Sequence, residues 1–163
     1  MKKSILREIQ KLCKGENINK IIKLICCKQI GAGVYRDVYI LKQDNNYVVK
    51  IERDMSTGIF ANVTEWRNYI NNKEWDYIKD WLAPIELINQ TGQIMIQKRV
   101  SLEGKKCKDF PKYIPSLFND LKRKNFGWIG DKFVCCDYSF FIPLIVQKNK
   151  NELKYACWKG KVI

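Results

Sequence analysis

The sequence predicts an α+β fold in which helices pack on a small antiparallel β-sheet. Apolar residues recur at helical spacing near the N-terminus, and short apolar runs divided by turn-forming residues follow between residues 27 and 100. Hydrophobic residues make up 46% of the 163-residue chain and aromatic residues 12%, a balance typical of folded proteins. We therefore expect a single domain with a sizeable core.

Two amphipathic helices are expected first, over residues 2–13 and 17–25, because Ile and Leu recur there at helical spacing. Residues 1–26 would thus form a helical extension ahead of the sheet. A β-hairpin is expected over residues 27–52, since the turn-forming cluster at residues 44–46 divides two apolar runs.

The remaining elements of the sheet follow the hairpin. A helix is expected over about residues 58–71, and a short second helix near residues 75–80. Strands at about residues 85–89 and 93–100, divided by the turn at Thr91-Gly92, complete a five-stranded antiparallel sheet with a helix on it.

Residues 101–163 are expected to contain fewer regular elements. A short helix is predicted over residues 111–121, and a small hairpin at residues 128–136 would carry Asp137. The apolar run at residues 140–146 is too short to span a bilayer, and no secretory apolar core follows the first residues, so we expect no membrane.

The segment around residue 120 has the pattern of a phosphotransfer site. Asp120 is followed by Lys122 and Asn125, and Asp137 stands behind an apolar run twelve residues later. In-line phosphoryl transfer needs a carboxylate that orients the attacking hydroxyl, and it needs oxygen ligands for Mg²⁺. We therefore assign Asp120 to the acceptor hydroxyl, Lys122 to the transferring phosphoryl group, and Asn125 and Asp137 to the metal.

A glycine-rich segment lies upstream of this site. Gly31, Ala32 and Gly33 are followed at the spacing of a phosphate-binding loop by Val38, which would cover an adenine ring. Glycine lets the backbone approach phosphate closely. Taken alone, the segment fits a simple hairpin turn equally well.

Lys50 is the next candidate, near the end of the apolar run that starts at residue 47. It would contact the α- and β-phosphates of a nucleotide, and Glu65 of the following helix would pair with it. Glu74 is a competing partner near the expected helix end. The segment at residues 97–99 would be a hinge whose backbone amides read adenine, with Gln97 in it and Met95 just before it.

These motifs together resemble those of the protein-kinase-like superfamily, over roughly residues 28–141. The resemblance implies an N-terminal lobe over residues 27–100, a strongly reduced C-terminal lobe over residues 101–163, and ATP with Mg²⁺ as ligands. Five residues stand in the family's order: Lys50, Glu65, Asp120, Asn125 and Asp137.

The sequence departs from the family pattern at several positions. Arg36 takes the place of the third glycine, Asn119 precedes the catalytic aspartate where His-Arg is usual, and Ser139 replaces the glycine of the metal motif. The chain ends 26 residues after Asp137, where a full kinase would have an activation segment. These features are similar to truncated, miniature kinases of the phage or bacterial-effector type.

Charge and cysteine content restrict the partners. The net charge of +13 favours an acidic partner, and basic residues concentrate before and within the phosphotransfer segment. An acidic protein is the expected partner; nucleic acid, stacked on Trp128 or Tyr113, and a merely solvated surface are the alternatives. The basic residues concerned are Lys105, Lys106, Lys108, Lys112, Lys122, Arg123 and Lys124.

Seven cysteines occur without paired C-x-x-C spacing, and the chain has no histidine. Zinc sites completed by histidine and Ser-His-Asp or Cys-His catalysis are therefore excluded. We expect reduced thiols and a cytoplasmic location, the host cytoplasm for a phage or effector protein.

The sequence thus predicts an ATP- and Mg²⁺-dependent phosphotransferase that acts on Ser or Thr of a protein. The alternative is a catalytically weak pseudokinase that binds or inhibits an acidic protein or nucleic acid. A small-molecule or RNA-associated phosphotransferase is a third hypothesis.

Overall fold

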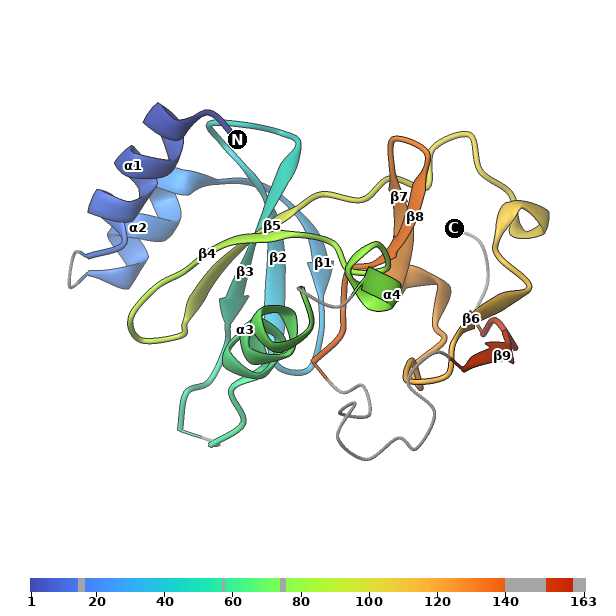
Figure 1. The fold of residues 1–163 in the computed structure, drawn as a ribbon. Helices are drawn as coiled ribbons and strands as arrows, with labels where there is room; N and C mark the ends of the chain where they lie inside the picture. The colour runs from blue at the N-terminus through green and yellow to red at the C-terminus, as the bar shows by residue number, and fades with distance from the viewer. Residues whose placement is uncertain (15–16, 57, 74–75, 140–151, 160–163) are drawn as a thin grey trace. The chain divides into compact units, whose positions relative to one another are not determined.

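The computed structural model describes residues 1–14, 17–56, 58–73, 76–139 and 152–159 (Figure 1). The chain forms two compact units. The first contains Met1–Trp66 and Pro84–Arg99, and the second contains Arg67–Ala83 and Val100–Ile163. One boundary between the units therefore falls one residue from the division that the sequence predicts after residue 100, and another falls within a helix.

The first unit is built on a five-stranded antiparallel sheet, as predicted from the sequence. The strand order is β1-β2-β3-β5-β4. Its turn at Gly92 has a φ of +77°, a conformation that glycine adopts without steric cost. The elements are α1 (Lys3–Leu12), α2 (Ile18–Ile25), β1 (Cys26–Ala32), β2 (Arg36–Leu41), β3 (Tyr47–Glu52), α3 (Ala61–Asn72), β4 (Ile85–Ile88) and β5 (Ile94–Lys98).

Helices cover both faces of this sheet (Figure 1). Ile9 of α1 and Ile21 of α2 belong to one apolar core with Val49 and Ile51 of β3. Because side chains alternate along a strand, Lys50 points to the opposite face, where it meets α3. This two-sided cover explains why every residue of β3 is buried.

The second unit contains two small antiparallel sheets, one pairing β6 with β9 and the other pairing β7 with β8. Its core is aromatic: the rings of Phe110, Phe126, Trp128, Phe133 and Trp158 pack mainly edge to face. The elements are α4 (Asp76–Lys79), β6 (Tyr113–Pro115), β7 (Phe126–Ile129), β8 (Lys132–Cys135), β9 (Leu153–Tyr155) and 3₁₀ turns at Cys107–Asp109 and Arg123–Asn125. The N-terminal half of α3 belongs to the first unit and its C-terminal half to the second.

The helix predicted over residues 111–121 is wrong. Tyr113–Pro115 instead forms β6, which pairs with β9. Pro115 cannot donate a backbone hydrogen bond and disfavours a helical conformation in the residue before it, so this segment is poorly suited to a helix. The α3 helix also starts at Ala61, later than expected, because Gly58 has a φ of +70°.

Two features singled out in the sequence, Glu74 and the apolar run at residues 140–146, lie outside the described residues. Across the part of the chain that is described, no helix has the length and apolar character needed to cross a bilayer.

Candidate functional site

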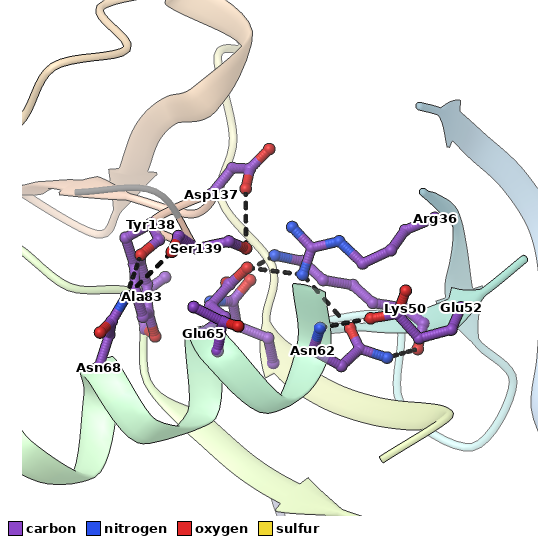
Figure 2. Close-up of polar contacts among 12 residues, drawn as sticks. Arg36, Lys50, Glu52, Asn62, Glu65, Asn68, Ala83, Asp137, Tyr138 and Ser139 are labelled. Atoms are coloured by element: carbon purple, nitrogen blue, oxygen red, sulfur yellow. Dashed lines mark hydrogen bonds and ion pairs between the residues drawn. The ribbon is translucent and has the colours of Figure 1, made fainter. Parts of the chain in front are cut away.

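The centre of the first unit's site is an ion pair between β3 and α3. Nζ of Lys50 lies 2.7 Å from Oε1 of Glu65, and the two residues are only 4% and 0% exposed (Figure 2). The pair expected from the sequence is therefore present. Breaking a buried ion pair by removing one partner typically costs about 3–5 kcal/mol, since the other charge stays buried alone.

Glu65 accepts two further hydrogen bonds. Nη1 of Arg36 lies 2.7 Å from Oε2, and Nε2 of Gln97 lies 2.9 Å from Oε1. Both donors are buried residues from the sheet, Arg36 on β2 and Gln97 on β5. Three strands thus direct donors at one carboxylate of α3, which satisfies the charge in the low-dielectric interior.

Asn62, in the first turn of α3, adds contacts that sequence reasoning did not anticipate. Its Nδ2 donates to the backbone carbonyls of Lys50 and Gln93, each at 3.1 Å, and its backbone N–H donates to the carboxylate of Glu52 (Figure 2). Nothing in the local sequence marks Asn62. Its position one helical turn before Glu65, on the same helix face, is the signal that could have identified it.

Glu52 is the second buried carboxylate of this unit, at 2% exposed. Within the described residues its Oε2 atom accepts no hydrogen bond, whereas Oε1 accepts the N–H of Asn62. Burial raises the pKa of Glu52 above its ordinary value, opposed in part by that hydrogen bond and by the charge of Arg36.

The glycine-rich segment forms the tight turn between β1 and β2. The N–H of Gly33 donates to the carbonyl of Arg36 at 2.8 Å, and Gly31 pairs with Val38 across the hairpin. Neither glycine has a positive φ, and an added Cβ would meet its nearest neighbours at 3.4 Å or more. The turn geometry alone therefore does not require glycine at these positions.

The segment expected to bind adenine is built into the sheet. Met95 is fully buried and pairs with Lys50 on the neighbouring strand. The backbone amide of Lys98 donates to Pro84, and that of Arg99 donates to Asn46, both at 2.8 Å. Both of these amides therefore serve hydrogen bonds within the first unit.

In the second unit, Asp120 and Asn125 are in direct contact. Nδ2 of Asn125 lies 3.0 Å from Oδ2 of Asp120 and 3.2 Å from its backbone carbonyl. Lys122 also reaches this carboxylate, with Nζ 2.9 Å from Oδ2. The 3₁₀ turn at Arg123–Asn125 produces this arrangement, because it folds Asn125 back towards Asp120.

Asp137 lies beside this group. The N–H of Cys136 donates to the carbonyl of Asn125 at 2.7 Å, so the next residue, Asp137, starts at the end of the 3₁₀ turn. The pKa of Lys122 is raised by its hydrogen bond to Asp120 first, then by the negative charges of Asp120 and Asp137. The four residues predicted to serve the acceptor hydroxyl, the transferring phosphoryl group and the metal thus belong to one unit.

The segment after Asp137 is held in place by polar contacts of the second unit. Oγ of Ser139 donates to Oδ1 of Asp137 at 3.5 Å, and Nδ2 of Asn68 donates to the carbonyls of Tyr138 and Ser139 at 2.8 and 3.2 Å (Figure 2). The hydroxyl of Tyr138 donates to Ala83 at 2.7 Å. These bonds fix the backbone from which the Asp137 carboxylate projects.

The donor atoms suit Mg²⁺. Nδ2 of Asn125 donates to Asp120, so Oδ1 is the atom of that amide able to bind a cation. Asp137 is an exposed residue. In the described ranges no group of three or more Cys, Asp or Glu side chains could hold a metal by itself. Mg²⁺ typically completes its coordination with phosphate oxygens and water, so a site with one carboxylate and one amide fits it.

The basic surface predicted from the sequence is only partly suited to bind a partner. Lys105, Lys106, Lys108 and Lys112 are exposed, whereas Arg123 is half-buried. Trp128 is 8% exposed within the aromatic core, so its predicted role as a stacking platform is wrong. Tyr113 is 57% exposed and packs edge to face with Tyr155, so it remains accessible to a base.

Six cysteines are free thiols: Cys13, Cys26, Cys27, Cys135, Cys136 and Cys157. Burial raises the pKa of Cys13 to about 11 and that of Cys26 to about 12. Both are therefore protonated at neutral pH and pack as small apolar side chains, as expected.

No protein-family model, curated protein or solved structure matches this chain. The function is therefore inferred from the geometry around Lys50 and Glu65 in the first unit, and from that around Asp120, Asn125 and Asp137 in the second.

Proposed function

We propose that the protein is an ATP- and Mg²⁺-dependent phosphotransferase that transfers the γ-phosphoryl group to a Ser or Thr hydroxyl of a protein. The observation that carries this proposal is the buried pair of Lys50 and Glu65, 2.7 Å apart. Buried ion pairs are weak contributors to stability compared with apolar side chains of similar volume, because desolvation offsets the attraction. Lys50 pairs across the sheet with Val38, which itself pairs with Gly31, and a buried lysine in register with a glycine-rich segment fits a functional role better than a structural one.

The first unit would bind the nucleotide. Lys50 would contact the α- and β-phosphates, oriented by Glu65, and the backbone of the turn at Gly31 and Gly33 would approach the phosphates closely. The absence of a conformational need for these two glycines supports this role over that of a plain hairpin turn. Val38, Met95 and Gln97 would line the adenine side.

The second unit would supply the metal and acceptor groups. Asn125 and Asp137 would hold Mg²⁺, which neutralises charge on the phosphates when bound. The Asp120 carboxylate would accept a hydrogen bond from the acceptor hydroxyl and orient its oxygen towards the γ-phosphorus. That oxygen forms the new P–O bond as the bond from the γ-phosphorus to its bridging oxygen breaks and ADP leaves, and the hydroxyl proton passes to the Asp120 carboxylate. Lys122 would offset charge on the transferring group.

Positioning and charge stabilisation account for most of this chemistry, so a reduced second unit suffices in principle. The hydrogen bond from Asn125 to Asp120 at 3.0 Å supports the assignment, because it links the residue proposed for the metal to the residue proposed for the acceptor. The amide at Asn125 thereby fixes the carboxylate of Asp120.

One observation favours a second function, that of a pseudokinase acting as a binding module for an acidic protein. Arg36 stands at the third glycine position, and its guanidinium is directed at Glu65. If this arginine obstructs the phosphates, the fold would keep the site residues without turnover, and the net charge of +13 would serve partner binding.

A phosphoryl-transfer assay separates the two functions. Wild-type protein incubated with γ-labelled ATP and Mg²⁺ should label itself or a generic Ser/Thr substrate, and Asp120→Asn should abolish labelling while still binding MgATP. Asp131→Asn is the matched control, since Asp131 is an exposed aspartate of the same unit in the turn between β7 and β8. Nucleotide binding without transfer by the wild type would favour the pseudokinase. Labelling of RNA or a small alcohol alone would assign a different acceptor.

A further inference from the structure

Arg36 departs from the glycine-rich pattern, yet its side chain is buried against α3. The residue is 8% exposed, and Nη1 lies 2.7 Å from Oε2 of Glu65 and 3.3 Å from Oδ1 of Asn62 (Figure 2). A glycine at this position could make neither contact. Arg36 therefore ties the hairpin of β1 and β2 to two successive turns of α3.

Asn62 fixes the same helix to the sheet one turn earlier. Its side chain donates to the carbonyls of Lys50 on β3 and of Gln93 just before β5. Its backbone N–H, one of the first-turn donors that a helix cannot satisfy internally, donates to Glu52. A carboxylate at a helix N-terminus is also electrostatically favourable. The start of α3 is thereby fixed along the sheet.

Arg36, Lys50 and Glu65 form one group of buried charges in which both cations contact the same carboxylate. Arg36 and Lys50 each bind a different oxygen of the single Glu65 carboxylate, at 2.7 Å in both cases. Arginine keeps its charge at every physiological pH, so its contact to Oε2 is not lost through deprotonation of the guanidinium. Without Arg36, Oε2 would lose a charge-assisted hydrogen bond in a buried position, which favours movement of Glu65 towards solvent. That movement would also remove the group that holds Lys50.

We infer that Arg36 is a positioning residue of the proposed phosphotransferase. Together with Asn62 it clamps α3 so that Glu65 holds Lys50 ready for phosphate. This inference rests on the proposed function. Its distinctive consequence is that restoring the third glycine, with R36G, should impair nucleotide binding although it brings the sequence closer to the glycine-rich pattern.

Titration calorimetry with MgATP tests this consequence. R36G should weaken MgATP binding by about tenfold or more, the effect of losing a charge-assisted hydrogen bond. R36K keeps the charge and one donor and should bind with intermediate affinity. The control is R53G: Arg53 pairs with Asp37 on the same hairpin, but its side chain is 44% exposed. R53G should bind MgATP within about twofold of the wild type.

Hydrogen exchange of the backbone amides in residues 61–66 gives a readout that does not depend on nucleotide. Exchange there should be faster in R36G than in the wild type, and R53G should match the wild type, because only the buried arginine reaches α3. If R36G does not fold, R36K and R36Q replace it, with MgATP affinity expected to fall from the wild type through R36K to R36Q.

The outcomes separate the clamp from the function on which it rests. Wild type that binds MgATP, together with R36G that binds equally well or better, overturns the clamp and leaves the proposed function intact. Unchanged exchange in α3 of R36G overturns the clamp as well. Wild type that binds no MgATP removes the proposed function, and the positioning role with it. The clamp is supported only if R36G binds MgATP more weakly than the wild type and its α3 amides also exchange faster.

Discussion

Nζ of Lys50 lies 2.7 Å from Oε1 of Glu65, and both residues are almost completely buried. An exposed pair of this kind would contribute at most about 1 kcal/mol to stability. The buried pair behaves differently, since each charge depends on the other for its solvation. Arg36 adds a second cation to the same carboxylate, so Glu65 contacts two buried, positively charged side chains.

Replacing Glu65 with glutamine should therefore destabilise the protein strongly. Lys50 and Arg36 would remain buried with a neutral amide in place of the carboxylate that both contact. We expect a loss of about 3–5 kcal/mol in the free energy of unfolding, which lowers the melting temperature by roughly 6–20 °C. Glu103→Gln, a change at an exposed position, should alter stability by no more than about 0.5 kcal/mol. A Glu65→Gln protein that melts with the control would show that the pair is not buried as described.

The metal assignment makes a separate prediction for the second unit. Asp137→Asn should reduce the rise in melting temperature that MgATP causes, because it removes the charged ligand of Mg²⁺. Asp120→Asn should keep most of that rise, since Asp120 is assigned to the acceptor. At one hundred times Kd a ligand adds about 2.7 kcal/mol, or roughly 5–11 °C at this size. If EDTA leaves the wild-type shift unchanged, or if Asp120→Asn loses more of it than Asp137→Asn, the two roles are misassigned.

Much of the first unit could be predicted from periodicity, and the limits of that prediction are physical. The spacing of Ile9 and Ile21 indicated helices, and the apolar run at Tyr47–Ile51 indicated a strand, because burial imposes those periods. The pairing of Lys50 with Glu65 followed from motif order. The bonds of Asn62 join residues 12 and 31 positions apart, a separation at which local sequence carries no signal.

Other expectations failed for identifiable reasons. The strand Tyr113–Pro115 has only three residues and ends at a proline, so its hydrophobic pattern carries no information on secondary structure. It pairs with β9, which lies far along the chain. The basic residues before and within the phosphotransfer segment suggest Trp128 as a stacking platform for nucleic acid, but its ring packs against those of Phe110 and Phe133. Trp128 becomes buried only when the second unit folds, so its own sequence neighbourhood does not reveal this.

The stability of the protein should depend on pH through Glu52. Its pKa in the folded state is raised above the ordinary value of 4.5, so the folded state binds a proton more tightly than the unfolded state. The contribution of Glu52 to stability is fully present below the ordinary pKa of 4.5, and it is lost as the pH rises through the raised pKa of the folded state. Glu52→Gln, which cannot ionise, should therefore gain melting temperature relative to the wild type as the pH rises to neutrality.

Thermal melts of the wild type and Glu52→Gln over that pH range check this expectation. Glu103→Gln again serves as the control, with a constant offset from the wild type. A difference between Glu52→Gln and the wild type that is flat, or that shrinks with rising pH, would contradict the raised pKa of Glu52.

The exposed lysines of the second unit should form a partner surface that is independent of the nucleotide. Reversing Lys105, Lys106 and Lys108 to Glu should abolish binding to an acidic peptide and leave the MgATP shift intact. The control reverses Lys20, Lys23 and Lys28, which are equally exposed and change the net charge by the same amount. Fluorescence polarisation measures both. If both triple variants lost peptide binding equally, the binding would depend only on net charge and not on a particular surface.

The same measurement with single-stranded RNA distinguishes the nucleic-acid alternative. RNA binding should weaken steeply with salt, with a log–log slope of about −0.7 per phosphate contact. It should also depend on Tyr113, which is exposed, and not on the buried Trp128. Binding of RNA in preference to the acidic peptide would replace the protein partner by nucleic acid.

Calorimetric titration of ATP into the wild type, with Mg²⁺ and then with EDTA, tests the central proposal most directly. We expect saturable binding with Mg²⁺, much weaker binding with EDTA, and loss of the Mg²⁺-dependent binding in Lys50→Met, whereas Lys42→Met, a change at an exposed lysine, should bind as the wild type does. Absence of binding at millimolar ATP with Mg²⁺, or equal binding by Lys50→Met, would contradict a phosphotransferase built on the Lys50–Glu65 pair.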